Sequence, residues 1–212
     1  MIKKKIEIQD IQKAFKGNKW NFGNSILYEM CRENPEHTCP EVIIGKVWLI
    51  GRSYAAAIER RKNVNVSDMG DDFYFNVVGP KMLEIGPELD ERISNLKQFN
   101  YITKENLKEV VETHLFLTNI FSDITGLNKR SLASKYLHFH APNMFYIYDS
   151  RTIISARKYI MQNKELRSWL TPFGDKEYID LVTRLFAFQK HVADQFGVSV
   201  TPRVIDSFLL NY

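Results

Sequence analysis

Apolar residues at helical spacing run through most of this chain, and this pattern limits the fold more than any other feature. Near the start, Ile8, Ile11, Ala14 and Phe15 lie three or four positions apart, so they share one face of a helix. The same spacing predicts further helices over 22–32, 41–62, 88–99, 103–121, 150–162, 176–188 and 202–210. The stretches 64–66 and 73–78 have an extended pattern, but they are short and isolated. We therefore expect a mainly α protein without a β-sheet.

Local signals place several helix ends. Thr103 is a favoured N-cap for the helix over 103–121. Thr201 is suited to cap a helix that starts at Pro202, because proline fits the first turn. Within 41–62, we expect a long buried helix that is interrupted or relaxed around Gly51. No repeat, low-complexity tract or flexible linker separates these elements.

Length and composition favour one folded unit over 1–212. A hydrophobic fraction of 44% in 212 residues is enough for a core, and we expect Trp20, Trp48 and Trp169 to anchor it. No apolar run approaches the roughly 20 residues of a membrane span. The N-terminal MIKKKIEIQ also lacks the apolar stretch of a secretory signal. We therefore expect a cytoplasmic protein that does not bind membranes.

The chain has two cysteines, Cys31 and Cys39. Two are too few for a disulfide framework or for a four-cysteine iron–sulfur cluster. His37 lies between them, but no fourth ligand follows at a spacing typical of zinc sites. We expect neither a metal nor a cofactor.

The segment 126–157 holds the candidate active site. Gly126 opens it as a turn, and a basic helix start follows around Ser131. Backbone N–H groups at such a helix start favour an anion, for example a DNA phosphate. After an apolar helix and a short loop, Asp149 stands directly before another helical pattern. Aspartate is a favoured N-cap, so this carboxylate has a structural interpretation beside a chemical one.

This segment resembles the helix-hairpin-helix DNA glycosylases of the base-excision superfamily. The tetrapeptide RSLA at 130–133 falls where adenine-type members carry a similar Arg-Ser-x-Ala, and FYIYD at 145–149 falls where the family has Phe/Val-Pro-x-x-Asp. In place of the family's Gly-x-Gly hairpin the chain has LNK at 127–129, preceded by Gly126. Asn128 is the best non-glycine residue for the positive φ that such a hairpin requires.

The resemblance implies a two-lobed helical fold with a cleft between the lobes. One lobe would combine 1–34 with 141–212, and the other would span 35–140 and include the hairpin-like motif at 122–140. The partner implied is DNA with a flipped base. Asp149 would be the catalytic residue. The implied DNA contacts are Gly126, Asn128, Lys129, Arg130, Ser131, Lys135 and Arg151.

The implied reaction is hydrolysis of the N-glycosidic bond of a damaged or modified base, including bases of phage DNA. Asp149 would stabilise the positive charge that develops on the sugar, or activate the attacking water. Bifunctional members use a lysine nucleophile at the position of Ser131, so we expect a monofunctional enzyme that leaves an abasic site. Lys135 lies one turn later on the same face, where it contacts phosphate or the pocket, or is simply exposed.

Candidates for the base pocket come from two regions. Tyr54 and Glu59 would enter from the opposite lobe, by stacking and by accepting hydrogen bonds; close helix packing is the alternative. His138 and Tyr148 are the candidates from the motif itself. His138 and His140 point to different faces of one helix, which argues against a shared metal site.

Two other functions remain open. The first alternative is a non-catalytic DNA-binding module that keeps the hairpin scaffold. The second is a helical protein-interaction domain in which Asp149 is only a cap. The formal net charge of +4 is compatible with DNA binding without demanding it. The sequence names no protein partner.

Overall fold

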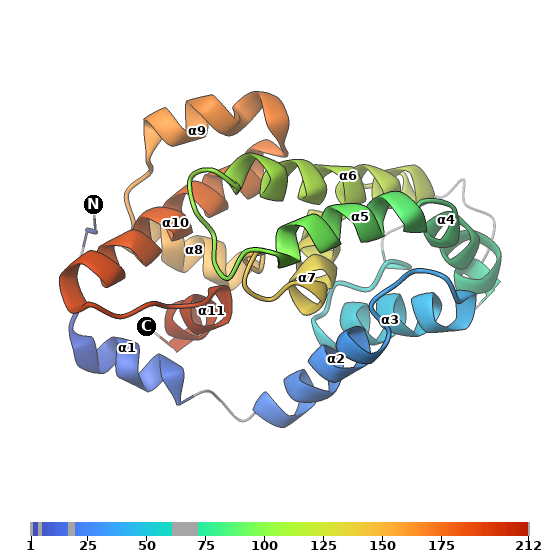
Figure 1. Cartoon of the computed structure of the whole chain (residues 1–212), viewed down its shortest axis with the longest axis horizontal. Coiled ribbons are helices and arrows are strands. Elements are labelled where there is room, and N and C mark those ends of the chain that lie inside the picture. Colours follow the sequence, from blue (N-terminus) through green and yellow to red (C-terminus); the bar gives the residue numbers. More distant parts are fainter. Residues whose placement is uncertain (1, 4–5, 17–19, 61–71, 212) are drawn as a thin grey trace.

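The computed structural model describes residues 2–3, 6–16, 20–60 and 72–211, and these form a mainly helical fold. The helices are α1 (Ile8–Phe15), α2 (Asn21–Glu33), α3 (Pro40–Ser53), α4 (Gly79–Glu84), α5 (Gly86–Lys97), α6 (Leu107–Thr125), α7 (Arg130–His140), α8 (Ser150–Tyr159), α9 (Lys164–Leu170), α10 (Lys176–Phe196) and α11 (Pro202–Asn211) (Figure 1). The predicted α class is thereby confirmed for the described part of the chain.

Extended structure is limited to a bridge between Ile2 and Ile160 among these residues. The stretch 73–78, which has an extended pattern in the sequence, is helical: its end forms a π-helical turn, Tyr74–Val78, before α4. The other extended stretch, 64–66, lies outside the described residues. None of the described helices has the length and apolar character that a membrane crossing requires.

Helix α7 lies at the centre of the fold (Figure 1). It packs against α6 on one side and against α2 and α3 on the other, so every residue from Leu132 to His140 is buried. A helix buried all round is normally apolar, yet this one carries Ser134, Lys135, His138 and His140. Buried polar groups need hydrogen-bond partners. Ser134, Lys135 and His138 have partners, whereas the two ring nitrogens of His140 have none among the described residues.

The N-terminal helices pack in two different places. Helix α1 lies on α11, which also packs on α8, whereas α2 lies on α7 and α3. In Figure 1, α1 and α11 accordingly sit beside α8 and α10, away from α2 and α3. A cavity separates these two groups of helices. The division into lobes at 34 and 140 stays a prediction.

The three tryptophans do not anchor the core, contrary to expectation. Trp20 is 76% exposed, and Trp48 and Trp169 are also exposed. Trp48 lies on α3 between the buried Val47 and the buried Ile50, but it points to the outer face, where the guanidinium of Arg52 covers its ring at 5.0 Å. Large aromatic side chains on peripheral helices thus reach the surface when the inner face is filled by smaller residues.

Three predicted helix boundaries differ from the structure. The helix predicted over 41–62 ends at Ser53, two residues after the expected interruption or relaxation at Gly51, and does not continue to 60; the predicted end at 61–62 lies outside the described residues. Helix α10 continues to Phe196, beyond the predicted end at 188. Helix α6 begins at Leu107 rather than near Thr103. There, the side-chain oxygen of Asn106 accepts a hydrogen bond from the backbone N–H of Thr103, at 2.9 Å. This local side-chain bond stabilises a turn in place of the first helical turn. The predicted start of α11 at Pro202 is confirmed.

Candidate active site

The loop before α8 is tied to α7 by Ser134. Its hydroxyl donates to the backbone oxygen of Ser131, at 3.0 Å, and accepts from the backbone N–H of Tyr148, at 2.9 Å. Because Tyr148 precedes Asp149, these bonds fix the position of the aspartate relative to α7. The start of α7 and the segment 145–149, which are separate in the sequence, are thus in direct contact in the structure.

Lys135 is the central polar group of the site. It is 1% exposed, and its Nζ donates to Ser131 Oγ at 2.8 Å and to the backbone oxygen of Tyr54 at 3.3 Å. Asp149 Oδ2 lies 3.6 Å from the same nitrogen. Burial lowers the pKa of Lys135, and the carboxylate of Asp149 partly offsets this effect. The expectation of an exposed lysine, or of a direct contact with phosphate, does not fit this buried position.

Asp149 caps α8 and also faces Lys135. One carboxylate oxygen, Oδ1, accepts from the backbone N–H of Arg151 at 3.0 Å, so the predicted N-cap is confirmed. The second oxygen lies toward the amine of Lys135, and the side chain is 33% exposed. The carboxylate is therefore held in a fixed orientation at the surface of the site, where a ligand can reach it.

An apolar cavity of about 510 Å³ opens beside these groups, between α2 and α3 on one side and α8 and α11 on the other. Its lining residues are Trp20, Gly23, Asn24, Ile26, Leu27, Leu49, Ser53, Tyr54, Arg151, Arg203, Asp206 and Leu210. Arg151 is two residues from Asp149. Lys135 and Asp149 lie close enough to Asp206 to influence its pKa, which burial raises. Apolar walls with few polar groups are typical of small-molecule sites.

A chain of hydrogen bonds crosses this cavity wall. Arg203 Nη1 donates to Tyr54 Oη at 3.3 Å and to Asp206 Oδ2 at 3.1 Å, and Tyr54 Oη donates to Asn24 Oδ1 at 2.6 Å. The other oxygen of Asp206 accepts from Thr152 Oγ1 at 2.9 Å. This chain connects α2, the end of α3, α8 and α11, and so holds the two sides of the cavity together.

The end of α3 explains why Tyr54 reaches the site. Ala55 has a φ of 51°, and its N–H donates to the oxygen of Arg52 while the next N–H, of Ala56, donates to the oxygen of Gly51 at 2.7 Å. This pattern is a Schellman motif, in which alanine occupies the left-handed position that glycine normally takes. The chain reverses there, which ends the helix and directs both the ring and the backbone oxygen of Tyr54 into the site.

The hairpin-like segment differs from the expected one. Gly126 ends α6 with a φ of 69°, but Asn128 does not take a positive φ. Instead, its side-chain oxygen accepts from the N–H of Arg130, and its amide donates to Asp175. Asn128 thus fixes the turn through its side chain rather than through a glycine-like backbone.

Arg130 and Ser131, both expected to contact DNA, are engaged within the protein. Arg130 makes two hydrogen bonds to Asp175, at 2.8 and 2.9 Å. Burial by itself raises the pKa of Asp175, but these bonds and the N–H of Tyr178 lower it to about 2. The Ser131 hydroxyl donates to the backbone oxygen of Tyr148, at 3.1 Å. These groups fasten the start of α7 to its neighbours.

A second cavity, of about 480 Å³, has a more polar lining that includes Ala55, the residue after Tyr54. The hairpin-like segment and the 55–60 segment line it, and they contribute Asn128, Lys129, Ser131 and Arg60. Lys129 Nζ donates to the backbone oxygen of Arg60 across this cavity. Among the expected DNA contacts, Gly126, Asn128 and Arg151 are exposed.

Not all predicted pocket residues come together. Tyr54 lines the apolar cavity, but Glu59 bonds to the hydroxyl of Tyr74 and pairs with Arg52. His138 is fully buried: its Nε2 lies 2.6 Å from the hydroxyl of Tyr28, and its Nδ1 lies 2.8 Å from the oxygen of Phe145. Neither Glu59 nor His138 lines the apolar cavity, and Tyr148, half-buried against Arg130, does not line it either.

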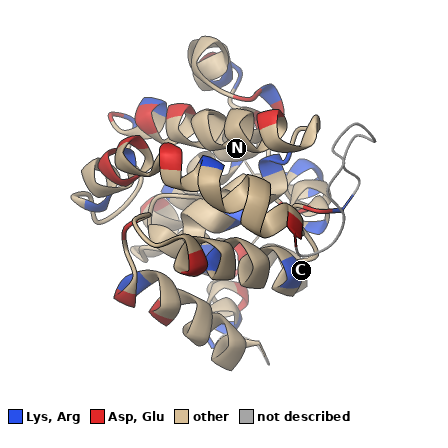
Figure 2. Ribbon diagram, turned by 90° about the vertical axis from the view of Figure 1, so that its right-hand side faces the viewer, with Lys and Arg blue, Asp and Glu red and all other residues tan. Residues whose placement is uncertain are grey.

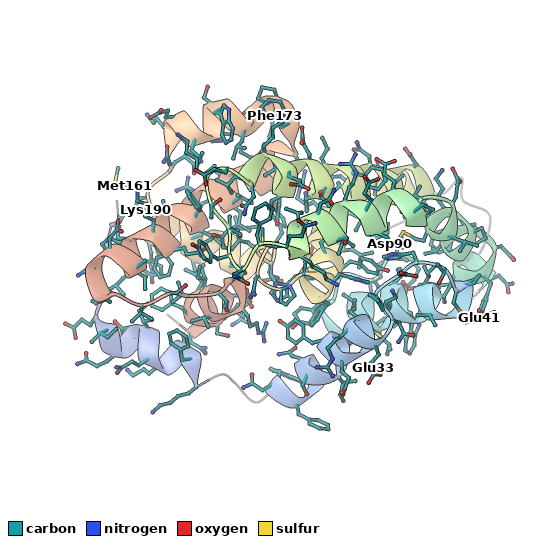
Figure 3. All side chains as sticks on the ribbon, viewed as in Figure 1. Glu33, Glu41, Asp90, Met161, Phe173 and Lys190 are labelled. Carbon is teal, nitrogen blue, oxygen red and sulfur yellow. The ribbon has the colours of Figure 1, made fainter. Side chains whose placement is uncertain are left out.

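His37 belongs to a buried cluster and not to a cysteine site. Its Nδ1 lies 2.5 Å from Asp90 Oδ1, and its Nε2 lies 2.6 Å from the hydroxyl of Tyr136 on α7. Figure 3 labels Asp90 on α5, at the side that faces the loop before α3. Burial lowers the pKa of His37. The residues that the structure describes include no group of three or more metal-ligating side chains.

On the side of the molecule seen in Figure 2, the described residues form no dominant basic face. Lys and Arg are interspersed there with Asp and Glu over the helices that the structure describes.

Models of protein families, curated proteins and solved structures were compared with the chain, and none of them matches it. The geometry of the site thus carries the functional argument.

Asn24, Arg203 and Asp206 are site residues that the sequence did not point to. Arg203 and Asp206 lie three positions apart on a helix that starts at Pro202, a spacing that puts them on one face. Such pairs are common on exposed helices, so the spacing by itself does not indicate a site. Asn24, 179 positions before Arg203 in the chain, carries no local signal.

Proposed function

We propose that the protein is a monofunctional DNA glycosylase that hydrolyses the N-glycosidic bond of a damaged or modified base. The observation that supports this most directly is the pairing of the oriented, partly exposed carboxylate of Asp149 with the buried amine of Lys135, 3.6 Å away. Neither residue lines the apolar cavity of about 510 Å³, but Tyr54, whose backbone oxygen accepts from Lys135, and Arg151, whose N–H donates to Asp149, both line it. This combination provides both a charge for the reaction and a space for the base.

The base would occupy the apolar cavity after rotating out of the duplex. Such rotation costs a few kcal/mol, and the cost is lowest for damaged or mismatched bases. Trp20, Leu27 and Leu49 provide apolar surface for a planar ring. The polar chain through Tyr54 and Arg203 forms the wall that the edge of the base would meet.

Asp149 would act on the sugar. As the bond between C1′ and the base nitrogen breaks, the electron pair leaves with the base and the sugar becomes positively charged. A fixed carboxylate stabilises this charge more strongly in the transition state than in the ground state. Water then forms the new bond to C1′, and its released proton balances the charge of the departing base. An abasic site and a free base result.

Lys135 would position Asp149 rather than attack the sugar. Its amine is 1% exposed and donates to Ser131 Oγ and the backbone oxygen of Tyr54. An amine held in this way lacks a free path to C1′. Its contact with Asp149 instead keeps the second carboxylate oxygen at a fixed place beside the cavity.

DNA contacts would come from the groups that remain at the surface around the site. Arg151 lies at the edge of the apolar cavity, and Asn128 and Arg60 border the second, more polar cavity. Positively charged groups at both cavities would suit contacts with a phosphate backbone. Arg130 and Lys135 would support the site from within.

The test is release of free base from DNA duplexes, measured by mass spectrometry over a panel of normal, damaged and phage-modified bases. We expect Asp149→Asn to abolish release without unfolding, because asparagine is as good an N-cap as aspartate. Asp123→Asn, the same change at an exposed position of α6, is the matched control and should retain full activity.

Other outcomes would point to the alternatives. Binding of DNA without release of any base, unchanged in Asp149→Asn, would indicate a non-catalytic DNA-binding module. Absence of DNA binding at low salt would favour a protein-interaction domain. Reduction with borohydride adds a third measurement: a covalent protein–DNA product, lost in Lys135→Met, would show that the lysine is a nucleophile and would refute the monofunctional assignment.

A further inference from the structure

We infer that the apolar cavity prefers a base with a carbonyl oxygen at the edge facing Asn24 and Arg203 over a base with an exocyclic amine there. Deaminated and oxidised bases belong to the preferred class, because a carbonyl replaces an amine or is added to the ring. The inference rests on the proposed function and specifies its substrate.

The orientation of the Asn24 amide follows from its neighbours. Arginine has donors and no acceptor, so the hydroxyl of Tyr54 must accept the hydrogen bond from Arg203, 3.3 Å away. The proton of that hydroxyl therefore needs another acceptor. Asn24 Oδ1, at 2.6 Å, provides it, and the amide nitrogen of Asn24 points the other way. The hydrogen-bond network thus determines the orientation of the Asn24 amide.

The amide nitrogen of Asn24 is the unused donor of this network. The side chain is 7% exposed and lines the cavity, and among the described residues its Nδ2 has no hydrogen-bond partner. A buried donor without a partner costs about 1–3 kcal/mol. The nitrogen itself is buried, so a ligand in the cavity would reach it only if the Asn24 side chain turned toward the cavity. An acceptor on the ligand would then remove the cost.

Arg203 adds a second donor on the same wall. Its Nη1 is occupied by Tyr54 and Asp206, which leaves other N–H groups of the guanidinium for a ligand. Two donors on one wall fit a single carbonyl oxygen, which has two lone pairs. An exocyclic amine at the same place is itself a donor, so it could not accept from Asn24 or Arg203. The amine and both protein donors would then be left unpaired.

The carboxylate of Asp206, the charged acceptor on this wall, already accepts two hydrogen bonds. Asp206 is 3% exposed, and its two oxygens accept from Thr152 and Arg203. Ser53, also a lining residue, carries a hydroxyl that both donates and accepts, so it does not discriminate. The charge-assisted bond to Asp206 holds the guanidinium in place, which makes Arg203 a fixed donor rather than a mobile one.

The experiment compares bases that differ in one group, uracil with cytosine and hypoxanthine with adenine. Binding of each free base to the full chain is measured by NMR titration, which does not depend on catalysis. We expect each carbonyl base to bind at least about tenfold more tightly than its amine partner, a difference of about 1.4 kcal/mol. Equal binding within both pairs, or no binding of any base, would overturn the inference.

Variants assign the preference to Asn24. Asn24→Leu removes the donor at similar size and should reduce the preference several-fold, whereas Asn24→Asp replaces the donor with an acceptor and should favour the amine bases. Asn119→Leu, an exposed asparagine on α6, should leave the preference unchanged. Circular dichroism verifies the fold of each variant. An unaltered preference in both folded Asn24 variants would contradict the assignment.

Base release from duplexes that contain uracil or hypoxanthine separates the two proposals. Selective binding of the free carbonyl bases without release from DNA would leave the cavity assignment intact and refute the glycosylase function. Release of bases from DNA without any preference for a carbonyl would support the glycosylase function and refute the assignment of Asn24 and Arg203.

Discussion

Acidification should destabilise this protein through its buried histidines, and His138 allows the size of the effect to be worked out. Because a backbone oxygen only accepts, the Nδ1 of His138 must donate to Phe145, and the Nε2 accepts from the hydroxyl of Tyr28. The folded protein thus holds the neutral ring. Burial, opposed by the bond to Phe145, lowers the pKa of His138 to about 4.

The sign and size of the effect follow from proton linkage. In the unfolded chain a histidine has a pKa of about 6.5, so between pH 6.5 and pH 4 the unfolded state binds a proton that the folded state does not. Stability is therefore fully present above pH 6.5 and is lost as the pH falls toward 4. For one such histidine, the loss between pH 7.5 and pH 5 is about 2 kcal/mol. His114, whose pKa burial also lowers to about 4, adds a loss of similar size.

Urea unfolding followed by circular dichroism at several pH values measures this loss. The comparison is between Tyr28→Phe and the double variant Tyr28→Phe/His138→Asn. The tyrosine change removes a hydroxyl that would otherwise lose its partner, and asparagine keeps a donor for Phe145. We expect the double variant to lose about 2 kcal/mol less than its parent between pH 7.5 and pH 5. An equal loss in both proteins would refute the linkage to His138.

Three further substitutions test the geometry around the site, each by urea unfolding at pH 7.5. Ala55→Gly should raise the free energy of unfolding by about 0.5–1 kcal/mol, because Ala55 has a φ of 51° that glycine adopts without strain; a decrease would argue against the Schellman motif. Gly86→Ala should lower it by about 1–3 kcal/mol, since the added Cβ would lie 2.6 Å from the backbone oxygen of His37; unchanged stability would show that this contact relaxes freely. Arg130→Met should lower it by about 2 kcal/mol by leaving Asp175 without its charged partner, whereas a neutral effect would mean that solvent replaces the pair.

Several local features of the fold could be predicted from the sequence because neighbouring residues decide them. The helical spacing of apolar residues gave the α class, and the caps at Asp149 and before Pro202 are where the chain signals them. The end of α3 could not be predicted in this way. It depends on a reversal at Ala55, and alanine does not carry the signal for a left-handed backbone that glycine does.

The candidate site was predictable in part. Asp149 and Tyr54 were identified from local patterns, and the structure brings both to Lys135. Asn24 and Arg203 were missed because their association depends on how α2 and α11 face each other across the cavity. The spacing of residues along a helix indicates which of them share a face, but it does not indicate which other helix packs against that face.

By itself, the sequence determined the helical character of this protein, the cap at Asp149 and the basic start of α7, since each follows from interactions within a few residues. Only the tertiary structure decided that Lys135 is buried, that Arg130 serves Asp175 instead of a free surface, and that Trp20 lies at the surface. The physical reason is that burial and the choice of a polar partner depend on contacts between distant segments. The same residue types would be solvated, paired or buried according to which helices pack against them.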